Sequence, residues 1–429
     1  MSADWFIGLD VGTSGCRAIA IDANEQIVAT ARRALPASSR PRQGWSEQSP
    51  ADWWQAATIV LKAIAQRGGR PRSLCIDGTS STLLLSNAEG QPLTAGLMYD
   101  DRRAATEADR IDGLAPADSP ARGAGSAISK LLYLLNQAAG ANAAFALHQA
   151  DWLTGCLTGR FGIADENNVL KLGYDPAAGI WPSWFDALPE VQALLPEVVP
   201  AGSPLGPIDP RVADTLALPD DLLIVAGTTD SNAATLAAGG RDPGDAVTSL
   251  GSTLVLKIWS DRPVNAARFG VYSHRLQGRW LTGGASNSGG AVLRQYFSDA
   301  ELVALSDEID PSRPSGLDYY PLPGVGERFP VSDPDFAPRL TPVPAEKSRF
   351  LQGMLEGIAR IEANGYRRLA ELGAPYPSRV VTAGGGAVNT VWREIREQML
   401  GVPVSTAGQT EAAFGVAGLA RSAWLASRG

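Results

Sequence analysis

Two short segments about half a chain apart share one pattern, and this repeat limits the fold more than any other feature of the sequence. They are "LDVGTSGCRAIAI", which begins at residue 9, and "TSLGSTLVLKI", which begins at residue 248. Each is an apolar run, a glycine followed by hydroxyl residues, and a second apolar run. This predicts a strand, a tight turn and a return strand. The repeat indicates two related halves whose turns favour binding one phosphate chain from opposite sides. Two ordinary hairpins with turn-favouring residues are the alternative.

Length and composition are those of a globular protein with no obvious macromolecular partner. The chain has 429 residues and a formal net charge of −8, enough for two or three domains. It contains no long basic run, so we expect no nucleic-acid partner. Three cysteines without a CxxC spacing and two histidines argue against a disulfide framework or a zinc site. No secretory or transit-like segment and no membrane-length apolar run are evident, so we expect a cytoplasmic protein without membrane contact.

Several familiar catalytic and nucleotide-binding signatures are missing. The sequence has no GxxxxGK[ST] loop, no GxGxxG after the first expected strand and no GxSxG elbow. A P-loop is therefore excluded, a Rossmann dinucleotide site is not expected, and nothing supports a Ser-His-Asp triad. A bound nucleotide would have to use the two hairpins and a separate pocket for its base.

The segment "TAGGGAVN" (382–389) is the best candidate for that pocket. Three consecutive glycines between an expected strand and an expected helix allow a flat ring to approach the backbone, and a helix N-terminus favours anions nearby. A plain strand-to-helix turn is the alternative.

Candidate acids follow expected strands at three places. Asp230 lies in "VAGTTDSNAATLAAG", where a carboxylate can accept a proton from a hydroxyl, although a helix N-cap explains it equally well. Asp10 precedes the first glycine turn and is either a strand-end acid or a group that orients Mg²⁺ through water. Asp77 in "CIDGTSS" repeats the strand-Asp-Gly-Thr pattern. The cluster "YDDRR" (99–103) reads as a sugar-hydroxyl site or, more simply, as solvated charges.

Periodicity predicts the main helices. Apolar spacing indicates helices over 50–67, 142–159 and 349–373, and the proline-dense stretch 310–345 is expected to be an ordered excursion without regular structure.

The ordered set of motifs resembles the FGGY family of carbohydrate kinases. "LDVGTSGCR" and "SLGSTLVL" are similar to its two phosphate motifs, "AGTTDSNAA" to the segment with the catalytic aspartate, and "TAGGGAVN" to its adenosine motif. "EAAFGVAGLA" resembles the closing helix. The likeness covers nearly the whole chain, which is shorter than usual for the family. Segments 315–330, 167–176 and 269–274 look most like a short subgroup of D-ribulose kinases from cyanobacteria and plants.

The resemblance implies an α/β fold with two RNase H-like, actin-like ATPase domains around a central cleft. By analogy, an N-terminal sugar-binding domain covers 1–237 and regains 411–429, and a C-terminal nucleotide-binding domain covers 238–410.

The resemblance also implies roles for the candidate residues, with ATP and Mg²⁺ as cofactors. Asp230 would be the general base, and Asp10 would orient Mg²⁺ through water and border the substrate. Asp77, Ser80 and Asp101 are weaker candidates for sugar contacts. The residues expected to bind ATP are Gly12, Thr13, Ser14, Gly251, Ser252, Thr253, Gly385, Gly386 and Asn389.

The expected activity is transfer of the γ-phosphoryl group of ATP to the terminal hydroxyl of a ketopentose, D-ribulose first, by a monomer or homodimer. D-xylulose, a polyol or glycerol are alternative substrates. A nucleotide- or sugar-binding protein that has lost turnover is the alternative from another functional class.

Overall fold

The computed structural model describes residues 4–428, which fall into two compact units. The first unit holds the described residues up to 237, together with 274–278 and those from 411 on. The second holds 238–273 and 279–410. Each unit has its own apolar core and a six-stranded mixed sheet. The expected α/β fold is therefore confirmed.

The sheet of the first unit brings three parallel strands together in its middle. In order across the sheet, the strands are β11 (Pro204–Pro207), β12 (Leu223–Thr229), β5 (Arg70–Gly78), β1 (Asp4–Val11), β2 (Gly15–Ile21) and β3 (Ile27–Ala34). Strands β12, β5 and β1 are parallel to one another, whereas β2 and β3 run antiparallel as a meander. The carboxyl ends of the three parallel strands consequently meet at one edge.

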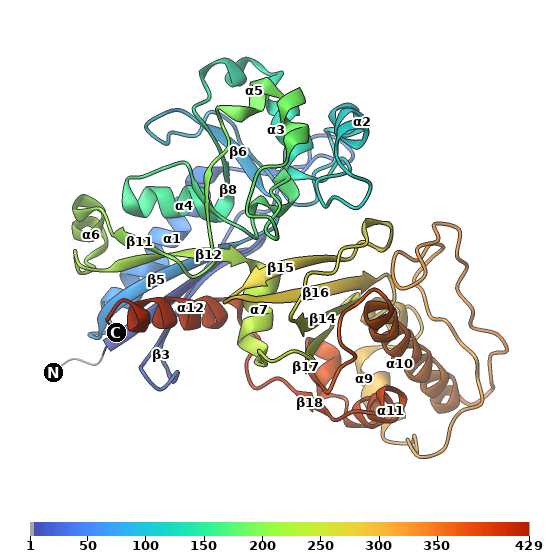
Figure 1. Cartoon of the computed structure of the whole chain (residues 1–429). Helices are drawn as coiled ribbons and strands as arrows, with labels where there is room; N and C mark the ends of the chain where they lie inside the picture. The colour runs from blue at the N-terminus through green and yellow to red at the C-terminus, as the bar shows by residue number, and fades with distance from the viewer. Residues whose placement is uncertain (1–3, 429) are drawn as a thin grey trace. The chain divides into compact units, whose positions relative to one another are not determined.

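Alternating side chains of β1 explain how helices cover both faces of this sheet. Ile7, Leu9 and Val11 share an apolar cluster with residues of α1 (Pro50–Ala65) and α4 (Gln149–Thr158). On the other face α12 (Ala412–Ala426) packs against β1 and β5 (Figure 1). A Cβ at Gly8 would lie 1.8 Å from the carbonyl oxygen of Ala413. Only glycine at this position lets the closing helix approach so closely.

A smaller four-stranded sheet extends the first unit. Its order is β4 (Glu47–Gln48), β7 (Gly96–Leu97), β6 (Leu83–Ser86) and β8 (Phe145–His148). The helix predicted over 142–159 is wrong at its start, because residues 145–148 pair antiparallel with β6 and only 149–158 are helical. Tertiary pairing overrides local propensity here. The other short elements of this unit are α2 (Ala105–Leu114), α3 (Ala127–Leu135), β9 (Ile163–Asp165), α5 (Pro189–Gln192), β10 (Glu197–Val199), α6 (Pro210–Leu216) and α7 (Asp230–Ala238).

The sheet of the second unit repeats the strand pattern of the first. Its order is β15 (Tyr272–Leu276), β16 (Arg279–Ser286), β14 (Leu254–Ser260), β13 (Asp245–Leu250), β17 (Arg379–Ala383) and β18 (Val404–Thr406). Strand β13 is antiparallel to β14 and parallel to β17, as β1 is to β2 and β5. The strand-turn-strand expectation is thus confirmed at both repeated segments.

Helices of the second unit lie beside this sheet. They are α8 (Gly290–Leu293), α9 (Asp299–Ser306), α10 (Lys347–Glu371) and α11 (Thr390–Leu400). Helices α10 and α11 pack side by side (Figure 1). The helices predicted over 50–67 and 349–373 are confirmed by α1 and α10, and 310–345 contains no helix or named strand. Within residues 4–428, no helix combines the length and apolar character needed to cross a bilayer.

Candidate active site

Three acidic residues gather at the carboxyl edge of the first unit's sheet. Asp10 on β1 and Asp77 on β5 are register partners across the parallel pair, and Thr228 of β12 is the partner of Asp77 on its other side. Asp230 follows two residues later as the first residue of α7. The carboxyl end of parallel strands is where ligands bind in open α/β sheets. The expected catalytic acids therefore share one edge.

Burial separates the three acids into two kinds. Asp77 is completely buried and Asp10 is 7% exposed, whereas Asp230 is only half-buried. Neither carboxyl oxygen of Asp77 has a hydrogen-bond partner among residues 4–428. Burial, reinforced by the charge of Asp10, raises the pKa of Asp77 well above its usual range. A buried carboxyl without donors is far cheaper to keep neutral, so burial favours the protonated form of Asp77.

The pKa of Asp10 is subject to opposing influences. Burial raises the pKa of Asp10, while the neighbouring Asp77 carboxyl and then the guanidinium of Arg17 act in the opposite direction. Arg17 on β2 lies 3.9 Å from the Asp10 carboxylate and 3.3 Å from that of Glu411.

Asp230 is the acid best placed to meet a ligand. Its carboxylate accepts a hydrogen bond of 2.6 Å from the amide of Ser231 at the start of α7. A helix N-terminus favours the anionic carboxylate that a general base requires. The cap and the base are thus compatible functions of one side chain.

Two hydrogen bonds hold the turn after β1 in place. The amide of Gly12 donates to the carbonyl of Gly15 over 3.0 Å, and Thr13 is half-buried while Ser14 is exposed. The buried side chain of Gln48 donates to the Thr13 carbonyl over 2.7 Å. Sequence reasoning missed Gln48, because only the paired strand β4 brings it to the turn.

The sugar-contact candidates differ sharply in access. Ser80 is the one residue of segment 79–82 that is not buried. Asp101 is fully buried, and its carboxylate accepts hydrogen bonds from the guanidinium of Arg103 and, over 2.6 Å, from the amide of Ser46. These bonds favour an internal ion pair for Asp101. Its direct contact with a sugar stays a prediction.

The "YDDRR" segment is only partly a solvated charge cluster. Tyr99 and Arg102 are exposed, and Asp100 pairs at 2.6 Å with the exposed Arg40. The simpler interpretation is wrong for Asp101, which is buried, and for Arg103, whose guanidinium contacts Glu47 of β4 at 2.8 Å.

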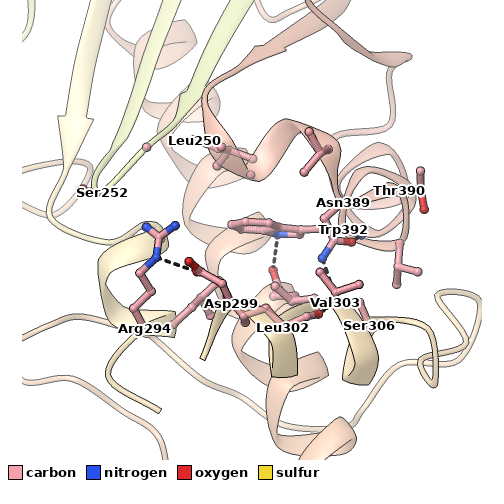
Figure 2. A pocket seen from close by; sticks show the side chains of 18 of the residues that line it. Leu250, Ser252, Arg294, Asp299, Leu302, Val303, Ser306, Asn389, Thr390 and Trp392 are labelled. Atoms are coloured by element: carbon pink, nitrogen blue, oxygen red, sulfur yellow. Dashed lines mark hydrogen bonds and ion pairs between the residues drawn. The ribbon is translucent and has the colours of Figure 1, made fainter. Parts of the chain in front are cut away.

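A separate cavity of about 590 Å³ opens in the second unit, beside the turn that follows β13. Figure 2 shows its side chains on the β13–β14 turn, on α9 and at the start of α11. The residues expected to bind ATP that line it are Gly251, Ser252, Gly385, Gly386 and Asn389. Trp392, Val303 and Arg294 also line it but were not predicted. Val303 and Arg294 lie far from the expected motif in the chain, whereas Trp392 lies only three residues after it.

The three glycines of the 382–389 segment differ in why a larger residue would or would not fit at their positions. Gly384 has a φ of +86°, and a Cβ there would lie 2.7 Å from the Leu250 carbonyl oxygen. A Cβ at Gly386 would lie 2.9 Å from both Leu250 and Trp392, whereas one at Gly385 would meet nothing within 4 Å. Gly384 and Gly386 therefore hold two segments together, and Gly385 faces open space.

Asn389 is occupied by structural bonds. Its side-chain oxygen accepts from the amide of Trp392 over 2.9 Å and caps α11. Its Nδ2 donates to the hydroxyl of Ser306 over 2.8 Å (Figure 2). These two bonds fix the orientation of Asn389 on the wall of the cavity and leave one amide hydrogen and one lone pair of its side chain for a ligand.

The acidic edge fits a magnesium ion that is held mainly by other ligands. Among residues 4–428, no three His, Cys, Asp or Glu side chains are grouped so as to hold a metal ion. Mg²⁺ usually takes one or two carboxylates and keeps waters and substrate phosphates. The carboxylate of Asp10 suits that role, whereas burial disfavours the ionised form of Asp77 that a metal would need.

Comparison with known proteins points to one family across both units. The models of the N-terminal and C-terminal domains of the FGGY family of carbohydrate kinases match residues 5–237 and 246–424. A xylulose kinase from Klebsiella pneumoniae is 27% identical, with 97% of this chain and 90% of that protein aligned. A glycerol kinase from Alkalilimnicola ehrlichii is 28% identical over the same shares.

Solved structures agree with this assignment. The crystal structure of a xyloylose kinase from Brucella ovis superimposes with a TM-score of 0.88 at 26% identity, covering 98% of this chain and 91% of that one. A gluconate kinase from Lactobacillus acidophilus shares the fold, with a TM-score of 0.86 at 19% identity. With both domain models matched in order over nearly its full length, the chain belongs to the FGGY family of carbohydrate kinases.

Proposed function

We propose that this carbohydrate kinase transfers the γ-phosphoryl group of ATP to the terminal hydroxyl of D-ribulose and forms D-ribulose 5-phosphate. The observation that carries the catalytic part is the position of Asp230. It is half-buried at the carboxyl edge of β12, beside two acids that are almost fully buried. The choice of D-ribulose rests on the resemblance of segments 167–176, 269–274 and 315–330 to short D-ribulose kinases.

Asp230 acts as the general base. It takes the proton of the attacking hydroxyl as that oxygen bonds to the γ-phosphorus and the bond to the β–γ bridging oxygen breaks, so that ADP leaves. Phosphoryl transfer needs mainly positioning and charge stabilisation, so no covalent nucleophile is required. Proton removal by a positioned carboxylate typically contributes a factor of about 10²–10⁴ in rate.

Each glycine turn offers groups that would bind phosphate oxygens: the amides and hydroxyls of residues 12–14 in the first unit and of 251–253 in the second. The cavity beside Gly385 would take the base and ribose. Mg²⁺, when bound, would neutralise phosphate charge, and Asp10 would hold it through water. Arg17, 3.9 Å from Asp10, limits the negative charge at this edge.

D-xylulose and glycerol are the alternative substrates, because a xylulose kinase and a glycerol kinase each align with 97% of this chain. They would use the same base and turns, with different contacts around residues 77–103. A handful of hydrogen bonds separates such sugars.

The test is release of ADP from Mg-ATP with D-ribulose, L-ribulose, D-xylulose, glycerol and ribitol, run beside Asp230→Asn. Stimulation by D-ribulose that the variant loses supports the whole proposal. Stimulation by another sugar replaces the substrate and keeps the mechanism. ATP binding without stimulation by any sugar would contradict the kinase assignment and favour a binding protein.

A further inference from the structure

A fully buried lysine joins the segment that follows β5 to a second turn in the first unit. Lys130 lies on α3, which packs beside β6 (Figure 1), and it is 0% exposed. Its Nζ donates to the backbone carbonyl of Ser81 over 3.0 Å and to that of Met98 over 2.7 Å. Lysine is almost never completely buried without a specific partner, so this arrangement calls for an explanation beyond packing.

The first of these segments, 79–82, connects β5 to β6 and holds Ser80. Ser81 adopts a φ of +61°, a left-handed conformation that side chains other than glycine rarely take. Its buried hydroxyl has no hydrogen-bond partner among residues 4–428. The conformation is therefore not stabilised by its own side chain. It is stabilised by the bond from Lys130 to its carbonyl and by the hydrogen bond between the hydroxyls of Thr79 and Thr82 on either side of it.

The second segment, 98–101, forms a tight turn that ends at the buried Asp101. The amide of Asp101 donates to the Met98 carbonyl over 3.0 Å, so this oxygen accepts from both the turn and Lys130. The amide of Met98 in turn donates to the carbonyl of Ser46 over 2.9 Å. One ammonium group thus joins the turn at 98–101 to the strained segment at 79–82.

We propose that Lys130 is a positioning residue for the sugar: by bridging the carbonyls of Ser81 and Met98, it fixes the backbone of the segment that carries Ser80 and follows directly after the strand of Asp77. This inference rests on the proposed sugar-kinase function. Lys130 is too deeply buried to touch the sugar and acts through the two segments.

The surroundings of Lys130 shift its pKa without removing its ability to donate to the two carbonyls. Burial lowers the pKa of Lys130 to about 7. The nearby charges that also act on it are those of Asp101, Lys171, Asp100 and Arg103. Both the ammonium and the neutral amine can donate to two carbonyls, so the bridge persists on either side of that value.

The experiment compares Lys130→Met, which keeps the length and apolar stem but removes the donor, with Lys62→Met on an exposed face of α1. Sugar and ATP dependence are measured for both, together with amide hydrogen exchange of the free proteins. For Lys130→Met we expect the KM for sugar to rise by about tenfold or more, with the KM for ATP unchanged. Amide protection should fall in 79–82 and 98–101 and nowhere else, and Lys62→Met should behave as wild type.

Lys130→Gln carries the test if Lys130→Met does not fold, because its shorter side chain retains an N–H₂ donor. We expect its sugar KM and its exchange in the two segments to lie between those of wild type and a protein without the bridge. An equal rise in both KM values, or exchange that increases evenly over the first unit, would mean that Lys130 is merely structural and would overturn the inference. Hydrogen exchange needs no turnover, so it reports on the bridge even if no sugar stimulates the wild-type enzyme.

Discussion

The two units share a strand-and-turn pattern but differ in the side chains that precede the turn. In the first, β1 and its parallel neighbour β5 carry Asp10 opposite Asp77 just before the turn. In the second, β13 and β17 carry Ser249 opposite Ala383 at the matching place. A repeated backbone therefore presents carboxyls in one unit and small uncharged side chains in the other.

This difference teaches how one fold supports both halves of a phosphoryl transfer. A proton acceptor requires a carboxylate near the reacting hydroxyl, whereas a carboxylate beside a triphosphate repels it unless a cation lies between them. The first unit has Asp230 at its strand edge, and the second has a cavity of about 590 Å³ lined by four glycines, Gly251, Gly290, Gly385 and Gly386. This contrast supports the proposed assignment of the sugar to the first unit and of the nucleotide to the second.

Removing the base should give the largest effect. Asp230→Asn keeps the shape and the cap on α7 but cannot accept the proton. We expect kcat to fall by about 10³-fold, with the KM for ATP nearly unchanged, as measured by ADP release. A variant that retains a tenth of wild-type turnover would mean that Asp230 is a cap and not the base.

Two neighbouring glycines in the second unit offer a matched pair. Gly384→Ala forces a Cβ against the Leu250 carbonyl at a φ of +86°. We expect a loss of about 1–3 kcal/mol in the free energy of unfolding. Gly385→Ala meets no neighbour within 4 Å, so its stability should stay within about 0.5 kcal/mol of wild type while the KM for ATP rises. Urea unfolding and ATP titration separate the two. Equal stabilities would show that the close approach of Gly384 carries no energetic weight.

Introducing an acid into the second unit should break the asymmetry directly. Ser249 is half-buried before the glycine turn, and Ser249→Asp places a negative charge where Asp10 lies in the repeat. We expect ATP affinity to fall by about tenfold from charge repulsion. Ser249→Asn is the control of similar size and should bind ATP like wild type. If both variants bind equally, the turn after β13 does not approach the phosphates.

The smallest effect on turnover is expected at Asp77. Because burial favours the protonated form of Asp77, Asp77→Asn replaces one neutral group by another and should change kcat by less than about tenfold. Folding raises the pKa of Asp77 above its ordinary value of 3.8. The wild-type protein therefore loses stability as the pH rises above 3.8, because the unfolded chain then ionises more readily than the folded one. The variant should therefore become increasingly more stable than wild type from about pH 4 upward, as followed by thermal melting. A variant less stable at pH 7 than at pH 4, relative to wild type, would show that Asp77 is ionised.

Much of this architecture could be predicted from local sequence. The repeated apolar-glycine-apolar pattern located both hairpins, and helical spacing located α1 and α10. These signals work because they are local and periodic. The strand at 145–148 was missed because its partner β6 lies far away in the chain.

The site was predictable only as a set of candidates. The pattern around Asp10 and Asp77 indicated two similar turns, but strand register decides that they are neighbours with unequal burial. No local signal marked the buried pairing of Asp101 with Arg103 or the contacts of Gln48 and Lys130 with distant carbonyls. Those depend on which loops fold against one another.

The most direct test of the division between the units is a pair of calorimetric titrations, Mg-ATP and D-ribulose, on Asp230→Asn and on Gly385→Val. If the acidic edge serves the sugar and the glycine-lined cavity serves the nucleotide, Asp230→Asn binds Mg-ATP as wild type does and turns over at about a thousandth of its rate. Gly385→Val should lose Mg-ATP binding and keep its affinity for the sugar. Loss of both ligands in either folded variant, or loss of sugar binding alone in Gly385→Val, would contradict the account.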